Sequence, residues 1–283
     1  MAGVGLVGVG DMGVQMLPHL LAAGFTVTAF DIDQTRRDAA LAAGARIADS
    51  PAAVAATADV VITLVMSDDI PAAHFGAHGV LAGLRPDSVL VIGSTTTPGM
   101  IDDVRAHAGD GALLADAPII GGVRYAREKA VTFLLGGCDE ASRRATAVLE
   151  VLGKVERVGA FGSGVRYKLI TNAFVMAAEV GLREALDLTD ILGGDYPTAL
   201  RLFQIGPMAA VVKRALDADN PRPLRASAQD FDALLSVVED PALLPISAAG
   251  RERLWAAVDG DPDYEPMFID LTRRTTARQP YRR

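Results

Sequence analysis

Three glycines near the N-terminus have the spacing of a loop that binds the pyrophosphate of a dinucleotide. The stretch GLVGVGDMG carries Gly8, Gly10 and Gly13 in the pattern GxGxxG. In such a loop the first glycine allows a tight turn, the second lets the pyrophosphate approach the backbone, and the third lets helix and strand pack closely. The amide groups at the following helix N-terminus would face the phosphates. We expect Gly8, Gly10, Asp11, Met12 and Gly13 to bind the cofactor.

An acidic residue after the second apolar run indicates which dinucleotide binds. The run TVTAF leads directly into Asp31, 18 residues beyond Gly13. A carboxylate at this place accepts hydrogen bonds from the 2′-hydroxyl of the ribose and repels a 2′-phosphate. Ile32 stands where an arginine could have bound that phosphate, although Arg36 and Arg37 follow closely. We therefore expect the cofactor to be NAD, with NADP the less favoured choice.

One lysine in the second half of the chain is unusual for this composition. Lys168, in the stretch GSGVRYKLITNAF, is one of four lysines, whereas the other 23 of the 27 basic residues are arginines. Asn172 follows four residues later, so both side chains would lie on one face of a helix, one turn apart. They could belong to a polar helix surface, or they could carry chemistry.

The elements that must position these residues differ between the two halves of the chain. The first half alternates Ala-rich segments with the apolar runs VGLVGV, TVTAF, DVVITLV, SVLVIG, ALLADAP and VTFLLGG. Strands that alternate with helices predict a parallel, doubly wound α/β sheet. Ser50 followed by Pro51 predicts the start of a helix over 51–57.

After about residue 158 the strand-like runs end and helical periodicity takes over. The segment KLITNAFVMAAEVGLREALDLTDIL has apolar residues at helical spacing for about seven turns, without proline. Its apolar surface is wide enough to be covered on several sides. Further helices are predicted around 198–216, 228–238 and 244–258. We expect a dinucleotide-binding domain over 1–160 and a helical domain for substrate and oligomer contacts over 161–283.

Composition and charge exclude several classes of protein. Half of the residues are hydrophobic and 22% are charged, which is typical of a globular protein. The net charge of −8 argues against nucleic acid as the main partner, although the tail from Arg273 is locally basic. The single Cys138 rules out an internal disulfide framework and favours a reducing compartment. No apolar run reaches the 18 or so residues of a membrane span, so a cytoplasmic protein with no membrane partner is expected.

Two histidines have a spacing that could hold a metal ion. His74 and His78 would share a helix face, but no third ligand lies nearby. We expect both side chains to be exposed to solvent and no metal to be bound.

Four motifs occur in an order that resembles the β-hydroxyacid dehydrogenase family. They are the GxGxMG pattern from Gly8, STTTPG from Ser94, DAPIIGG from Asp116 and GSGVRYKLITN around Lys168. This family includes 3-hydroxyisobutyrate dehydrogenase, tartronate semialdehyde reductase and, more distantly, 6-phosphogluconate dehydrogenase. The resemblance extends to the C-terminal segments QDFDALL and LPISAAGRERLWAAVDGDPDYEPMF, so it covers the whole chain.

The resemblance implies a fold and a chemistry. It implies an N-terminal Rossmann domain, an all-helical C-terminal domain joined to it by the long helix, and an active site in the cleft between them. It implies that Lys168 is the catalytic general acid or base, which exchanges a proton with the substrate oxygen as hydride moves to or from nicotinamide. Because the free pKa of lysine is about 10.4, the site would have to lower it by burial or by the helix N-terminus. Asn172 would hold Lys168 or a substrate oxygen.

The resemblance also locates residues around the substrate. Ser94 and Thr95 follow the strand SVLVIG at the sheet edge where ligands bind, so they either lie near the nicotinamide or substrate, or cap a helix. The expected substrate-binding residues are Ile120, Gly121, Gly122, Arg124 and Gln229.

Two of these positions depart from the family pattern. Ile120 replaces a serine before the glycine pair, and Gln229 replaces the lysine of a Lys-Asp pair. Losing a charge-assisted contact costs about 1.5 to 3 kcal/mol, so a small hydroxy acid would bind poorly unless Arg124 takes over. The substrate side is therefore expected to differ more than the cofactor side.

The main hypothesis is an NAD-dependent oxidoreductase that moves a hydride between nicotinamide and a small 3-hydroxy acid or a related alcohol or carbonyl compound. An imine or ketone reductase is the alternative, because a substrate without a carboxylate suits Ile120 and Gln229. A catalytically silent NADH sensor is a third possibility, against which the retained Lys168 and Asn172 count. The broadly apolar long helix predicts a homodimer or homotetramer.

Overall fold

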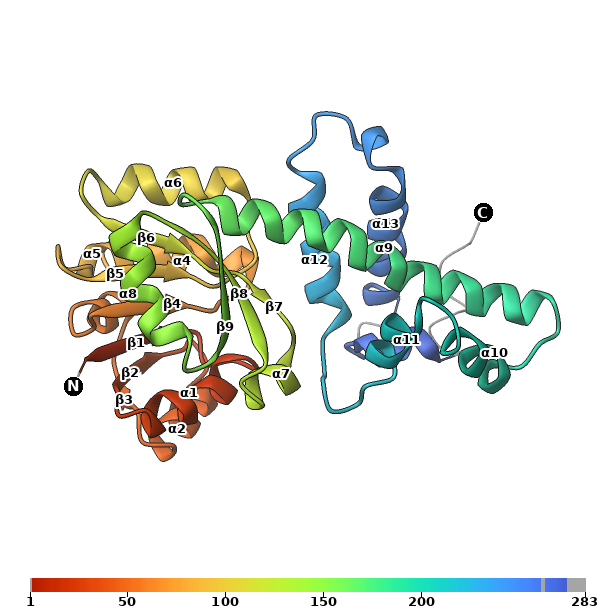
Figure 1. Ribbon diagram of the computed structural model, residues 1–283, viewed down its shortest axis with the longest axis horizontal. Helices are drawn as coiled ribbons and strands as arrows, with labels where there is room; N and C mark the ends of the chain where they lie inside the picture. The colour runs from red at the N-terminus through yellow and green to blue at the C-terminus, as the bar shows by residue number, and fades with distance from the viewer. Residues whose placement is uncertain (1, 261–262, 274–283) are drawn as a thin grey trace. The chain divides into compact units, whose positions relative to one another are not determined.

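The computed structural model describes residues 2–260 and 263–273, and the chain divides into two compact units. The first unit ends at Lys168 and the second begins at Leu169. This boundary falls inside one long helix, α9 (Ser163–Ile191), which is drawn as a continuous green ribbon in Figure 1.

The first unit is built on one mixed sheet in which parallel pairs dominate. Its strand order is β3-β2-β1-β4-β5-β6-β8-β7, with β9 paired to β8. All neighbours from β3 to β6 are parallel, whereas β8 runs antiparallel to β6 and β7. The strands are β1 (Gly3–Val7), β2 (Thr26–Phe30), β3 (Arg46–Ile47), β4 (Val60–Thr63), β5 (Val89–Ile92), β6 (Leu113–Asp116), β7 (Ile119–Ile120), β8 (Val131–Gly137) and β9 (Gly153–Gly159). The predicted doubly wound α/β fold is confirmed.

Helices separate the strands of this sheet, as the sequence predicts, except that β7 follows β6 directly. Ser50 accepts a hydrogen bond from the backbone of Ala53 through its hydroxyl, so the Ser-Pro start of α3 is confirmed. The helices are α1 (Gly13–Ala22), α2 (Gln34–Ala42), α3 (Pro51–Ala55), α4 (Ile70–His74), α5 (Val80–Gly83), α6 (Pro98–Ala108), α7 (Val123–Arg127) and α8 (Asp139–Leu149), with a 3₁₀ turn η1 (Ser67–Asp69).

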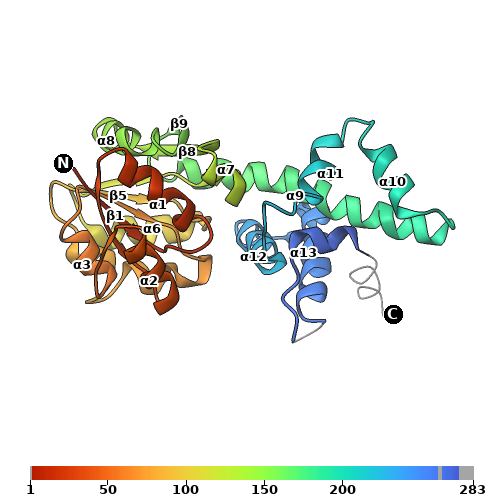
Figure 2. The ribbon, with the colours of Figure 1, turned by 90° about the horizontal axis from the view of Figure 1, so that it is seen from below.

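The described part of the second unit is helical. Besides α9 it contains α10 (Tyr196–Phe203), α11 (Ala209–Ala215), α12 (Leu224–Leu235), α13 (Pro245–Val258) and the 3₁₀ turns η2 (Pro241–Leu243) and η3 (Phe268–Thr272). Helices α12 and α13 pack side by side (Figures 1 and 2). The segment predicted to be helical around 198–216 forms two helices, α10 and α11, because Gly206 and Pro207 lie between them and a proline lacks the amide that helix continuation needs.

A buried arginine organises this second unit. Arg183 on α9 is 1% exposed and donates to the carbonyl oxygens of Leu271 and Arg273 and to the hydroxyl of Tyr196. Its ion pair with Asp187 compensates the buried charge. The end of the described chain is thereby tied to α9.

The expectation that His74 is exposed to solvent is wrong. His74 is buried rather than exposed, with its ring nitrogens bonded to the carbonyl of Ile70 and the hydroxyl of Thr63, and burial lowers its pKa.

Among the described residues no cluster of side chains could hold a metal ion, and no helix is long and apolar enough to cross a membrane. Most of the basic tail, from 274 to 283, lies outside the described residues.

Candidate active site

The glycine-rich loop between β1 and α1 has room only for glycine at two positions. Gly8 has a φ of +93°, and a Cβ there would lie 2.3 Å from the carbonyl oxygen of Leu64. A Cβ on Gly13 would lie 2.5 Å from the carbonyl oxygen of Gly8. Strand, turn and helix therefore approach as closely as the GxGxxG pattern requires, and the loop fits a dinucleotide pyrophosphate.

A hollow of about 280 Å³ opens beside this loop. Both signs of charge line it, and Arg36 extends over Gly10 with its Nη2 3.8 Å from the carboxylate of Asp11. Its lining residues are Val9, Gly10, Asp11, Val14, Asp33, Thr35, Arg36 and Ala39. The hollow lies where the loop meets the start of α2, so it can take the adenosine end of a dinucleotide.

Asp31 connects the end of β2 to the glycine loop. Its Oδ2 accepts from the backbone of Val9 at 2.9 Å, and its Oδ1 accepts from the backbone of Asp33 at 2.9 Å. Each carboxylate oxygen has a further lone pair, so the same group can also accept from a ribose hydroxyl. Arg37 is held by the carbonyl of Asp31 and the side chain of Gln34.

Ser94 fixes the loop that follows β4. Its hydroxyl accepts from the backbone of Val65 at 2.9 Å and donates to the carbonyl of Thr63 at 3.4 Å. The N-cap of α6 is Thr97, so neither Ser94 nor Thr95 caps that helix, and this alternative role is excluded.

Lys168 is the sixth residue of α9 and is joined to the DAPIIGG segment. Its Nζ donates to the carbonyl oxygen of Ile119 at 2.8 Å. The first turn of the same helix is bonded to Asp116, the buried last residue of β6. Asp116 accepts from the backbone of Gly162 through Oδ1 and of Val165 through Oδ2, each at 2.7 Å. One short segment thus holds both the start of α9 and its lysine.

The charge state of Asp116 reflects two opposing effects. Burial raises its pKa and the hydrogen bonds from the backbone of Val165 and Gly162 lower it, and burial prevails, so the pKa is raised to about 6. Gly164 is needed here, because a Cβ would lie 2.1 Å from the carbonyl oxygen of Leu134. Sequence reasoning missed Asp116 as a functional residue. The sequence signal that could have indicated it is an acidic residue at the end of a buried strand.

The residues after this acid form an edge of the first unit. Ile120 is 41% exposed on the short strand β7, and Gly121 has a φ of +132°. Gly122 precedes α7, and the guanidinium of Arg124 lies 4.8 Å from the ring centroid of Tyr125. The backbone amides of the two glycines and the cation of Arg124 therefore follow directly after the exposed side chain of Ile120.

In the second unit Asn172 belongs to a polar cluster that the sequence did not reveal. Its Nδ2 donates to Oδ2 of Asp230 at 3.2 Å, and Nη2 of Arg222 donates to the same oxygen at 2.8 Å. Gln229 is half-buried next to Asp230 on α12. Arg222 was not predicted, because its place in the cluster depends on how the loop before α12 folds back.

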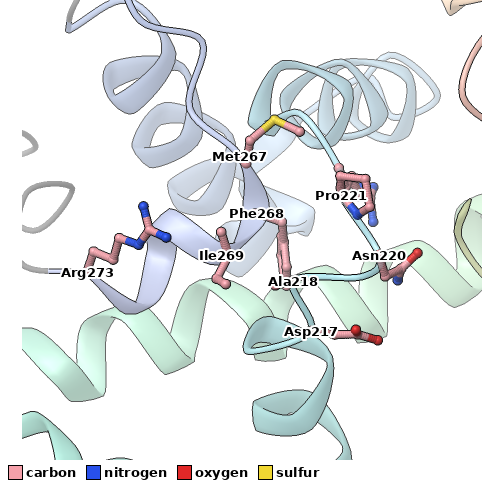
Figure 3. A pocket seen from close by; sticks show the side chains of 9 residues that line it. Asp217, Ala218, Asn220, Pro221, Met267, Phe268, Ile269 and Arg273 are labelled. Carbon is pink, nitrogen blue, oxygen red and sulfur yellow. The ribbon is translucent and has the colours of Figure 1, made fainter. Parts of the chain in front are cut away.

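A small cavity of about 150 Å³ lies beside this loop, and Arg222 is one of the residues that line it. Figure 3 shows Met267 and Phe268 facing the loop that carries Asn220 and Pro221, with Arg273 at the opposite end. The remaining lining residues are Asp217, Ala218, Arg222 and Ile269.

Comparison with known proteins identifies the family. Residues 3–163 match the NAD binding domain of 6-phosphogluconate dehydrogenase. The probable 3-hydroxyisobutyrate dehydrogenase-like 2 of Arabidopsis thaliana is 33% identical over 213 residues, which are 75% of this chain and 71% of the relative. L-threonate dehydrogenase of Cupriavidus necator is 30% identical over 283 residues, which cover 86% of this chain and 95% of that protein.

A solved structure confirms the fold over nearly the whole chain. The 3-hydroxyisobutyrate dehydrogenase of Mycobacterium tuberculosis, solved with L-serine, superposes with a TM-score of 0.78 at 23% identity and covers 96% of this chain and 98% of that one. The predicted Rossmann-like domain with a helical C-terminal part is confirmed by this likeness and by the matched domain. The chain therefore belongs to the β-hydroxyacid dehydrogenase family and is an NAD(P)-dependent oxidoreductase that acts on CH–OH groups.

Proposed function

We propose that the protein is an NAD-dependent dehydrogenase that transfers a hydride between nicotinamide and a small 3-hydroxy acid, with Lys168 as general acid and base. The observation that carries this proposal is the bond from Lys168 Nζ to the carbonyl oxygen of Ile119, on a helix whose first turn Asp116 holds. This bond holds the ammonium of Lys168 in one place, which suits a general acid that must meet the substrate oxygen at a defined position.

Each side chain then has a separate task. When bound, the nicotinamide supplies or accepts the hydride. The ammonium of Lys168 gives its proton to the carbonyl oxygen during reduction, and the neutral amine takes it from the alcohol during oxidation. Asn172, one turn later on α9, accepts from the substrate hydroxyl or from the lysine. The backbone amides of Gly121 and Gly122 donate to the anionic end of the substrate.

The preference for NAD rests on the end of β2. Asp31 brings a negative charge to the place of the ribose, and Ile32 is 79% exposed where a basic residue would serve a phosphate. Arg37 donates to the carbonyl oxygen of Asp31 and to the side chain of Gln34, which are neutral acceptors, so Arg36 and Arg37 are both nearby cations. The carboxylate of Asp31 would accept from the ribose 2′-hydroxyl and repel a 2′-phosphate, so NAD is the preferred cofactor in this proposal. Ser94 and Thr95, at the end of β5, are proposed to contact the nicotinamide end.

An imine or ketone reductase is the second candidate, because Ile120 presents an exposed apolar side chain and Gln229 carries no charge. A panel that compares 3-hydroxyisobutyrate, L-threonate and L-serine with neutral ketones and cyclic imines tests both. Turnover confined to the hydroxy acids supports the dehydrogenase. Turnover confined to the neutral compounds would replace it by the reductase.

A homodimer or homotetramer is part of the proposal. Helix α9 and the segment after α10 expose large apolar side chains, with Phe174 at 82%, Ile191 at 78% and Ile205 at 76% exposure. Surfaces of this kind commonly mark contacts between proteins. Light scattering after gel filtration measures the assembly, and a monomer at micromolar concentration would disprove this part.

A further inference from the structure

We propose that Arg222 determines substrate specificity by binding the carboxylate of the substrate, and so supplies the cation that Gln229 lacks. This inference rests on the proposed function and deepens it, since it assigns the enzyme to anionic substrates. Four features of the second unit support it.

The first feature is the set of contacts that the guanidinium makes. Nη2 of Arg222 donates to Oδ2 of Asp230 at 2.8 Å, and the side chain is 24% exposed. Over residues 2–260 and 263–273, Nε and Nη1 have no hydrogen-bond partner. A guanidinium has five N–H donors in a fixed plane. Arg222 therefore retains donors that can form a charge-assisted pair with a carboxylate.

The second feature is the link from Arg222 to Asn172. The carboxylate of Asp230 only accepts hydrogen bonds, so the amide nitrogen of Asn172 must face it, and the amide oxygen is left for another donor. Arg222 and Asn172 bond to the same carboxylate oxygen and are therefore close neighbours. In a 3-hydroxy acid the hydroxyl carbon and the carboxylate carbon are two C–C bonds apart. Asn172 and Arg222 can thus bind the two ends of one small substrate.

The third feature is the balance of charge. Without Arg222, the partly buried carboxylate of Asp230 would stand next to Asn172 and repel an anion. With Arg222 the pair is neutral, and Asp230 orients the guanidinium in advance. A pre-oriented arginine loses less side-chain entropy when it binds.

The fourth feature is the stiffness of the backbone that carries Arg222. Pro221 and Pro223 flank it and restrict φ on both sides. Its carbonyl accepts from the backbone of Phe268 at 2.7 Å, and Pro223 forms an isolated bridge with Met267. Figure 3 shows Met267 and Phe268 facing Asn220 and Pro221, which precede Arg222 in the same loop. A rigid backbone keeps the guanidinium at a defined distance from Asn172.

The test compares an acid with its uncharged ester. Binding of 3-hydroxyisobutyrate and of its methyl ester to the NADH-loaded protein is measured by calorimetry, and KM values are measured with NAD. For Arg222→Gln we expect affinity for the acid to fall about 10- to 100-fold and affinity for the ester to change less than about 3-fold. Arg225→Gln, which removes an arginine that pairs with Glu265 on the surface of α12, is the matched control and should alter neither.

Two further variants guard against a purely structural effect. Arg222→Lys keeps the charge and should retain more affinity for the acid than Arg222→Gln does, at a similar melting temperature. The double change Arg222→Gln with Gln229→Lys returns a cation to α12 and should recover part of the acid affinity. A role limited to stability would weaken acid and ester alike, and no cation at 229 would restore it.

The outcomes separate this inference from the proposed function. If the wild-type protein binds the acid but does not oxidise it, the proposed function fails and the binding data still decide the role of Arg222. If Arg222→Gln binds the acid within 2-fold of the wild type, or loses acid and ester equally, the inference is overturned. Failure of the wild type to bind either compound overturns both.

Discussion

The carboxylate of Asp116 accepts the backbone N–H of Val165 at 2.7 Å, across 49 residues of sequence. Its other oxygen accepts from Gly162 at the same distance. A residue at the end of a buried strand thus supplies the cap that α9 needs, since the first amides of a helix have no partner within it. The orientation of the helix segment that carries Lys168 depends on this contact.

Replacing Asp116 by asparagine should therefore affect both stability and rate. Asparagine offers one acceptor oxygen instead of two, so one of the two backbone amides loses its partner in a buried place. We expect the free energy of unfolding to fall by about 1 to 3 kcal/mol and kcat to fall while affinity for NADH stays within a few-fold. Urea denaturation, steady-state kinetics and NADH fluorescence measure the three quantities.

Asp102→Asn is the matched control for this variant, because Asp102 pairs with Arg105 on the exposed side of α6. It should change none of the three quantities appreciably. An Asp116→Asn protein with the stability and kcat of the wild type would show that the cap does not position Lys168.

The same carboxyl should make stability depend on pH. Burial raises its pKa from 3.8 to about 6, so between these values the folded protein keeps a proton that the unfolded chain has released. Stability contributed by this group is then fully present below pH 4 and declines as pH rises to about 6, by about 3 kcal/mol at most. The difference in the free energy of unfolding between the wild type and Asp116→Asn isolates the effect. Urea unfolding at pH 4.5 and 7.5 measures this difference. A difference that is equal at both values, or larger at pH 7.5, contradicts the assignment.

The parts of the site that are local in sequence could be predicted, and those formed by distant segments could not. Gly8 and Gly13 were found because a tight turn and a close helix impose a fixed spacing. The sequence shows Asp116 only as part of a motif, because its partners lie 46 and 49 residues away. Arg222 could not be predicted for the same reason, since its contact with Asp230 depends on how the loop before α12 folds.

The elements of the fold could likewise be predicted only where their signal is local in the sequence. Buried strands such as β4 and β5 consist of consecutive apolar residues and were found. Strand β9 reads GKVERVG and is largely exposed. Its sequence therefore contains no apolar run from which a strand could be predicted, although β9 pairs with β8. His74 was expected in water because a histidine carries little information about burial, whereas the structure pairs both its ring nitrogens inside the first unit.

The choice between the two cofactors can be tested at Asp31. Asp31→Asn keeps an oxygen for the backbone of Val9 but removes the negative charge. We expect the ratio of kcat/KM for NAD to that for NADP to fall by about 10-fold or more, because repulsion of the 2′-phosphate is relieved. Asp38→Asn, on the exposed side of α2 beside Gln34, is the control. An unchanged ratio would mean that Asp31 only holds the loop.

The proton-transfer role of Lys168 is tested by separating its charge from its acidity. Lys168→Ala should lower kcat by about 100- to 10,000-fold, because the substitution removes the group that transfers the proton. Affinity for NADH should stay within a few-fold of the wild type, because no contact with NADH is removed. Lys168→Arg keeps a cation, but a guanidinium does not release its proton near neutral pH, so this variant should be nearly as slow as Lys168→Ala. Lys213→Ala, an exposed lysine on α11, is the control. If arginine restores most of the rate, the group acts through charge alone, and if alanine retains most of it, another residue moves the proton.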